Sequence, residues 1–179
     1  MVARLESYER IMRLKCLART GWMQRGVPPA LAETVASHSF EAAMLAYLIA
    51  LEIGSGKINA YRAAFAALLH DAAEALVGDI PLWSSRRLGG LKDGLEEEAA
   101  RELGLNDIAG MLGEEGIRHI VRAADLLATA LQARRYMKMG YIETREIYQT
   151  SRNALCRIIE EELRDAQRLV ESLLEEPCR

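Results

Sequence analysis

Four ionisable side chains stand in segments that are otherwise apolar. His70 and Asp71 directly follow the apolar run at residues 63–69, His38 begins an apolar helix face, and Asp125 interrupts the mostly apolar stretch at residues 120–131. A buried charge is costly unless it has a partner, and two imidazoles with two carboxylates form a donor set for a divalent cation that keeps open positions. The sequence therefore predicts that these four residues hold one divalent metal ion: Mn, Co, Fe, Zn or Mg.

The spacing around His38 indicates that its side chain points into the protein. Apolar residues follow it at the intervals of a helix face: Ala42, Leu45, Ala46 and Ile49. Residues with this spacing lie on one side of a helix. We therefore expect His38 to face the core together with them.

The elements that must carry these residues are predicted to be helices. Ala, Leu, Glu and Arg dominate the composition and favour helix, and no stretch alternates with a period of two. Gly and Pro separate helices expected over residues 3–17, 34–53, 59–76, 92–103, 117–137 and 145–174. Asn59 is expected to cap the third of these, an Ala-rich helix at the centre of the protein. The predicted fold is all-α, a single domain at residues 1–179 built as a bundle of six or seven helices.

The order of the candidate ligands resembles a known family. A histidine, a distant His-Asp pair and a later single Asp are typical of the HD-domain metal-dependent phosphohydrolases. Residues 70–81 read HDAAEALVGDIP and are similar to the 5'-deoxynucleotidase subgroup, whose members dephosphorylate deoxyribonucleoside 5'-monophosphates. The segments at residues 14–25 and 35–39 are similar as well. This likeness covers most of the chain and weakens after about residue 132.

The resemblance implies a role for several residues. The four candidate ligands would hold the metal. Glu74, expected on the same helix face as His70, would orient or deprotonate the attacking water. Asp79 would sit near the sugar or leaving oxygen as a proton donor, Arg19 would bind the phosphate, and Trp22 would wall a nucleoside pocket.

Structural roles for the same residues stay open from the sequence. Asp125 is an alternative partner for Arg122, and Trp22 is an alternative core anchor. Asp79 also suits a Gly-Asp turn, and Arg19 also suits a solvated loop.

A second tightly bound ion is not expected. Only His119 remains as a histidine, and its offset from Asp125 puts the two on different helix faces. Glu97 and Glu98 are the remaining candidates for a weaker second site, although a solvated helix face is the simpler interpretation.

Composition narrows the class of partners. The net charge of -3 does not indicate a surface that binds nucleic acid. The longest apolar stretch is too short to span a bilayer. Cys16, Cys156 and Cys178 match no zinc or redox spacing, so we expect reduced thiols and a cytoplasmic location. The apolar positions of residues 145–174 are expected to pack on the core or to form a homodimer.

The sequence therefore predicts an enzyme that hydrolyses a phosphomonoester, most consistent with a (deoxy)nucleoside 5'-monophosphate as its small-molecule substrate. Two alternatives remain at this point: an HD phosphodiesterase or nucleotide pyrophosphohydrolase, and a non-catalytic nucleotide-binding regulatory domain.

Overall fold

Helix α3 (Val35–Glu52) is the central element of the computed structural model, which describes residues 2–178, with side chains from residue 5 onward. Thr34 caps the helix, because its hydroxyl accepts a hydrogen bond from the Ser37 backbone N–H at 3.2 Å. The chain turns after Ile53 through Gly54, whose positive φ suits glycine. Both ends therefore agree closely with the predicted helix.

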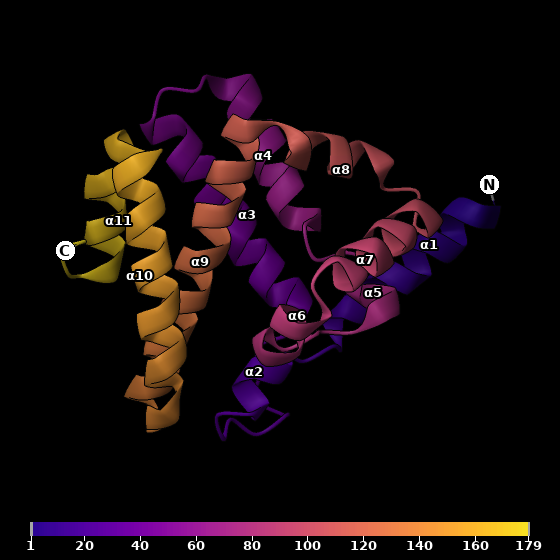
Figure 1. Cartoon of the computed structure of the whole chain (residues 1–179), viewed down its shortest axis with the longest axis horizontal. Coiled ribbons are helices and arrows are strands. Elements are labelled where there is room, and N and C mark those ends of the chain that lie inside the picture. The colour runs from indigo at the N-terminus through magenta and orange to yellow at the C-terminus, as the bar shows by residue number, and fades with distance from the viewer. Residues whose placement is uncertain (1, 179) are drawn as a thin grey trace.

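Helix α4 (Lys57–Leu69) runs beside α3, and helix α9 (Glu115–Lys138) packs against both (Figure 1). Alanines line the buried side of α4, which lets the backbones approach closely: Ala60, Ala63, Ala66 and Ala67. Three details of the predicted helix are wrong. It begins at Lys57, so Asn59 is no cap and instead donates to the Ser55 carbonyl, and it ends at Leu69. Its other side is exposed rather than central.

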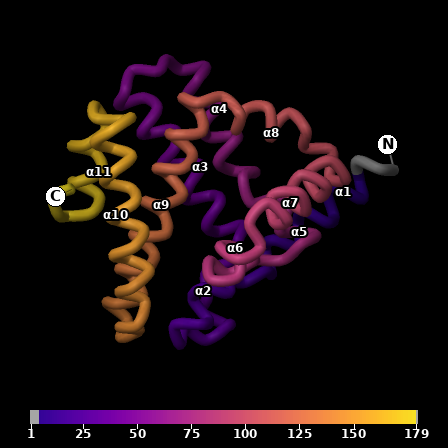
Figure 2. Tube along the Cα trace, viewed as in Figure 1, coloured from indigo at the N-terminus to yellow at the C-terminus, as the bar shows by residue number. Residues whose placement is uncertain are grey.

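The C-terminal region forms a layer against α9. Here the single helix predicted over residues 145–174 is divided into α10 (Arg145–Glu161) and α11 (Gln167–Leu174), separated by a short 3-10 turn. Figure 2 shows the chain reversing at this break, and α11 then packs against α9. The expectation of reduced thiols is wrong here, because Cys156 and Cys178 form a disulfide that ties the end of the chain to α10. Cys16 is a free, exposed thiol.

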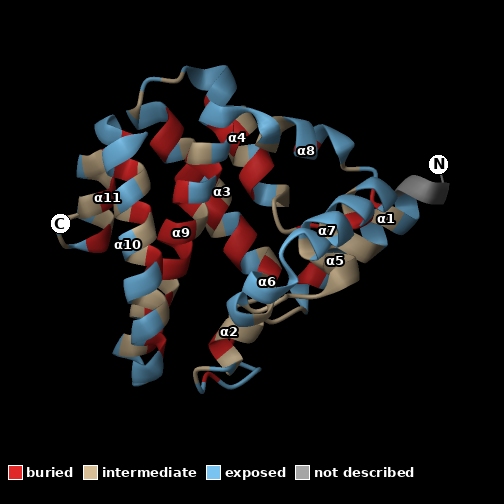
Figure 3. Cartoon of the chain, in the orientation of Figure 1, coloured by how far each residue is buried: buried red, intermediate tan, exposed pale blue. Residues whose placement is uncertain are grey.

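A second layer lies on the opposite side of α3 and α4. Figure 1 shows α1, α5, α6 and α7 gathered there, with α8 leading back to α9. The bounds of the remaining helices are α1 Val2–Met12, α2 Thr20–Met23, α5 Glu74–Val77, α6 Leu82–Leu88, α7 Gly90–Glu102 and α8 Asn106–Gly113. Buried residues concentrate between α3, α4 and α9 (Figure 3), so the core sits in the middle of the bundle.

The all-α, single-domain prediction is confirmed. Residues 2–178 contain no strand, only an isolated bridge between Ala18 and Thr34. They contain more helices than the six or seven expected, because short helices occupy segments that carry Pro and Gly. Among the described residues, no helix has the length and apolarity needed to cross a membrane.

Candidate metal centre

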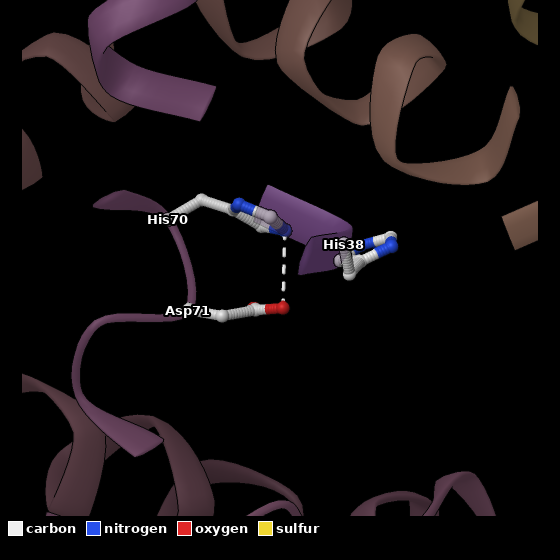
Figure 4. A group of neighbouring side chains, drawn as sticks. All are labelled: His38, His70 and Asp71. Carbon is white, nitrogen blue, oxygen red and sulfur yellow. Dashed lines mark ion pairs between the residues drawn. The ribbon is translucent and has the colours of Figure 1, made fainter. Parts of the chain in front are cut away.

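Three of the predicted ligands lie together where α3 begins and α4 ends. His38 is in the second turn of α3 and is fully buried, while His70 is the C-cap of α4 and Asp71 follows it in a turn. One ligand atom from each of the three lies within 4.8 Å of those of the others. Figure 4 shows the His70 imidazole and the Asp71 carboxylate facing each other, with His70 Nε2 3.2 Å from Asp71 Oδ2, and the His38 ring beside them.

Asp125 joins this cluster through His38. It lies in the middle of α9, and its Oδ1 is 3.1 Å from His38 Nε2. Its second oxygen accepts a hydrogen bond from Arg122 Nη1 at 2.8 Å. The pairing with Arg122 considered from the sequence therefore occurs, and α9 places the aspartate beside His38, while its role as a metal ligand stays a prediction.

The chemistry of His70 fits a metal ligand. Its Nδ1–H donates to the Ala67 carbonyl at 2.6 Å, which leaves Nε2 as the nitrogen that faces the cluster. Nε2 is buried and makes no hydrogen bond of good geometry, although the Asp71 carboxylate is near. A histidine whose outer N–H is held by a carbonyl while its inner nitrogen is free has the arrangement found in metal sites. The donor set of two nitrogens and two carboxylates fits a divalent ion.

The charges in the cluster reinforce one another. Burial by itself lowers the pKa of His70, but the negative charges of Asp71 and Asp125 outweigh burial and raise that pKa to about 9. Burial raises the pKa of Asp71, but the positive charge of His70 overcomes this and holds it below its usual value. The pKa of Asp125 is likewise lowered, against the effect of burial, by the His38 hydrogen bond and the neighbouring cations. The site is thus a buried pocket of negative charge that favours a cation.

Arg19 lies inside the site rather than in solvent. Its Nη1 is 2.7 Å from His38 Nδ1 and 3.3 Å from the Thr129 hydroxyl. Because a guanidinium only donates hydrogen bonds, Nδ1 of His38 accepts here and Nε2 carries the proton toward Asp125. For Nε2 to bind an ion instead, the proton must sit on Nδ1, where it would need an acceptor.

Glu33 is the acceptor available to that nitrogen, and the sequence analysis missed it. Its Oε2 is 3.9 Å from His38 Nδ1 and 3.6 Å from Arg19, and its side chain is only 5% exposed. Burial raises the pKa of Glu33, although His38 and Arg19 lower it in part. The available signal was an acid five residues before His38, in an Ala-rich segment directly ahead of the helix cap.

Trp22 occupies the second of the two roles expected for it. It is buried, packs edge-on against Tyr136 with ring centroids 5.2 Å apart, and donates from Nε1 to Glu33 Oε2 at 3.1 Å. It therefore anchors the core and reaches the centre through Glu33.

Glu74 and Asp79 lie on the chain that follows the His-Asp pair. Glu74 begins α5 after a turn, so the prediction that it shares a helix face with His70 is wrong. Its Oε2 is buried without a hydrogen-bond partner, and burial together with the charges of Asp71 and Asp79 raises its pKa to about 9. Asp79 accepts a hydrogen bond from the Thr20 backbone N–H, which ties it to the loop carrying Arg19.

The candidates for a second ion lie elsewhere. His119 faces Glu162 at 3.5 Å, and Glu97 and Glu98 are exposed on α7. The described residues therefore gather one cluster of possible ligands around His38.

Comparison with known proteins identifies the family. A profile described as HD domain matches residues 11–139. The chain belongs to the HD-domain family. Members of this family are metal-dependent hydrolases, generally phosphohydrolases, and bind divalent metals.

Relatives of this HD-domain protein support the same assignment. The 5'-deoxynucleotidase YfbR of Shigella boydii is 37% identical over 78 residues, which cover 41% of this chain and 37% of that protein. The chain thus spans little more than a third of that relative. A structure from Pyrococcus horikoshii is 28% identical with a TM-score of 0.76, covering 96% of this chain and 98% of the other. One from Pyrococcus furiosus is 25% identical with a TM-score of 0.79, covering 96% and 99%.

Proposed function

We propose that this HD-domain protein hydrolyses the phosphomonoester of a nucleoside 5'-monophosphate, of the deoxyribose series, to nucleoside and phosphate. The observation that carries the proposal is the cluster of His38, His70 and Asp71, with Glu74 and Arg19 beside it. The name of the YfbR relative supplies the substrate class.

His38, His70, Asp71 and Asp125 would hold the ion. When bound, a divalent ion offsets charge on a phosphoryl group and lowers the pKa of water. All four side chains are largely buried. Three of them sit on α3, at the end of α4 or within α9, and Asp71 directly follows α4 in a turn, so the packed helices of the core fix where the site lies.

Glu74 is the residue we assign to proton transfer. Its carboxyl oxygen Oε2 is buried without a partner, so it can accept a hydrogen bond from water. Without the ion, the raised pKa keeps Glu74 protonated at neutral pH; the positive charge of a bound cation would favour its ionised form, which could take a proton from water. Asp79 is held by the Thr20 N–H, and we assign it to positioning the Arg19 loop, with proton donation to the leaving oxygen as the further role implied by resemblance.

Arg19 supplies positive charge opposite these carboxylates. Burial lowers the pKa of Arg19, but Asp71, Glu33 and Asp125 outweigh this and raise it, so the guanidinium stays charged. A charged, planar donor beside the cluster is suited to phosphate oxygens. Binding phosphate would require its bond to His38 to be exchanged for one to the substrate.

A phosphate-release screen tests the proposal. The protein loaded with Mn²⁺ is assayed on ribo- and deoxyribonucleoside mono-, di- and triphosphates and on cyclic nucleotides. We expect turnover of the monophosphates, with the deoxy forms preferred. Turnover of cyclic nucleotides or triphosphates alone would assign a phosphodiesterase or pyrophosphohydrolase, and binding without turnover of any class would assign a regulatory domain.

Two variants separate the roles within the site. Asp71→Asn should lower metal content, measured by elemental analysis, because it removes a charged ligand. Glu74→Gln should keep the metal and lose rate by about 100-fold or more, the size typical of general acid–base catalysis. Wild-type rates for Glu74→Gln would remove Glu74 from the mechanism.

A further inference from the structure

The outward side of α3 carries a row of exposed apolar side chains. Phe40, Met44, Leu48 and Leu51 follow one another at helical spacing, and Phe40 is 64% exposed. They lie on the side of α3 away from the buried face that begins with His38. A soluble helix normally places polar residues there.

The neighbouring helix α4 repeats the pattern. Ile58, Tyr61, Phe65 and Leu68 share one side of the helix and are exposed, with Ile58 at 76%. The alanines of α4 occupy its buried side. Large apolar residues are therefore outside and small ones inside, the reverse of what folding of one chain alone requires.

The two rows form one continuous surface. Helices α3 and α4 pack side by side, joined by a short connection. Tyr47 of α3 stacks on Tyr61 of α4 across the seam, with ring centroids 5.8 Å apart and planes at 15°. We call the eight exposed residues of the two rows the hairpin face.

The extent of the hairpin face matches one side of a protein interface. The eight residues are between 40% and 76% exposed. Taking roughly 100 Å² of exposed surface at each position, about half the area of one aromatic side chain, gives about 800 Å² of largely apolar surface. That is more than the roughly 300–600 Å² of the largest patch on a typical monomer. It is close to the about 800 Å² that each partner buries in a standard stable complex.

We propose that the hairpin face is the contact surface of a homodimer, in which α3 and α4 of two copies pack across a twofold axis. A twofold interface requires one surface to complement itself. The face meets this condition because beside its projecting aromatic rings lies a groove of 490 Å³, lined in part by Leu31, Phe40 and Met44. Each copy can therefore offer apolar side chains to the groove of the other.

The charges at the edge of the face favour a second copy over a charged partner. Arg135 makes two bonds to Glu41, at 2.6 and 2.7 Å, and Arg62 pairs with Glu114. Both arginines beside the face are thus already neutralised within the chain. The eight positions of the face itself carry no charged residue.

The dimer expected from the sequence used a different surface, residues 145–174. Ile159, Leu163, Val170 and Leu174 of that segment are buried within the chain itself, so they cannot serve as the contact. The hairpin face replaces them.

The oligomeric state of the full chain tests the proposal. Light scattering after size exclusion, at high micromolar concentration, should give twice the 19.9 kDa mass of one chain. Leu48→Glu should raise the dimer dissociation constant by about 100-fold or more, because two carboxylates would be buried near the axis. Leu95→Glu on α7 is the matched control, since Leu95 is 41% exposed and Leu48 is 40% exposed, and it should remain a dimer.

Circular dichroism separates dissociation from unfolding. Leu48 is on the surface of one chain, so Leu48→Glu should keep wild-type helix content while becoming a monomer. A monomeric wild type would overturn the proposal and assign the face to a different partner. A dimer that survives Leu48→Glu combined with Phe65→Glu, or that Leu95→Glu breaks equally, would place the interface elsewhere and overturn it too.

Discussion

Replacing Glu33 by glutamine tests how the centre prepares His38 to bind a metal. The carboxylate of Glu33 lies 3.9 Å from His38 Nδ1 and 3.6 Å from Arg19, and it accepts from Trp22. Glutamine has the same shape and keeps an oxygen for Trp22. Only the negative charge that would stabilise a proton on Nδ1 is lost.

The expected effect on metal binding is large. Loss of an outer partner of a metal-binding histidine lowers affinity by about 10–100-fold, or about 1.4–2.7 kcal/mol. Isothermal titration of metal-free protein with Mn²⁺ measures this directly. The control is Glu41→Gln, which removes the same charge from α3 but breaks only a pair with Arg135 at the edge of the molecule.

We expect Glu33→Gln to lower metal affinity but not to lower the stability of the metal-free protein. Burial raises the pKa of Glu33 above its ordinary value, so its ionised form is disfavoured in the folded state and weakens stability at neutral pH. This loss of stability is complete at pH values above the pKa of Glu33 in the folded protein. It disappears at pH values below the pKa of Glu33 in the unfolded chain. Glu33→Gln should therefore melt at the wild-type temperature or higher without metal. Unchanged Mn²⁺ affinity, or a melting temperature that falls along with it, would refute the role of Glu33.

Three further predictions concern proton linkage and stability. Since His70 has a pKa of about 9 without metal, a metal must displace its proton, so apparent affinity should rise about tenfold per pH unit from pH 7 toward 9; a flat profile in titrations at several pH values would exclude His70 as a ligand. Tyr136→Phe should lower the free energy of unfolding by about 1–3 kcal/mol, because the buried hydroxyl bonds two backbone groups at 2.7 and 2.9 Å, and denaturant titration would detect it. Reducing the Cys156–Cys178 bond, which closes a separation of 22 residues, should lower stability by about 3 kcal/mol; thermal melts with and without reductant that coincide would contradict this.

Local signals explain why parts of the fold and site were predictable. Thr34 and Gly54 mark the ends of α3 by capping and by positive φ, and both act on the chain next to them. His38 could be oriented from its own helix because apolar residues follow it at helical spacing. Its burial and its approach to the His70-Asp71 pair agree with that prediction.

The errors come from interactions between distant segments. Nothing in the Ala-rich run marks the end of α4 at Leu69, because good helix formers resume at residues 72–76, directly after the His-Asp pair. The predicted helix therefore continued past the break. The role of Glu33 could not be predicted because it comes from contacts with Trp22 and Arg19, which folding brings next to it. The pairing of Cys156 with Cys178 depends on the reversal between α10 and α11, which no glycine or proline announces.

The order of the ligands along the chain has a consequence for how the centre assembles during folding. His38, His70 and Asp71 all belong to one antiparallel helix pair, joined by a short turn. Contacts that are local in sequence form early, so these three groups can meet as soon as the pair closes. Asp125 arrives only when α9 docks. We therefore expect the three ligands on α3 and α4 to come together first and Asp125 to join them when α9 docks. A metal ion that needs all four ligands would then bind only after the core has formed.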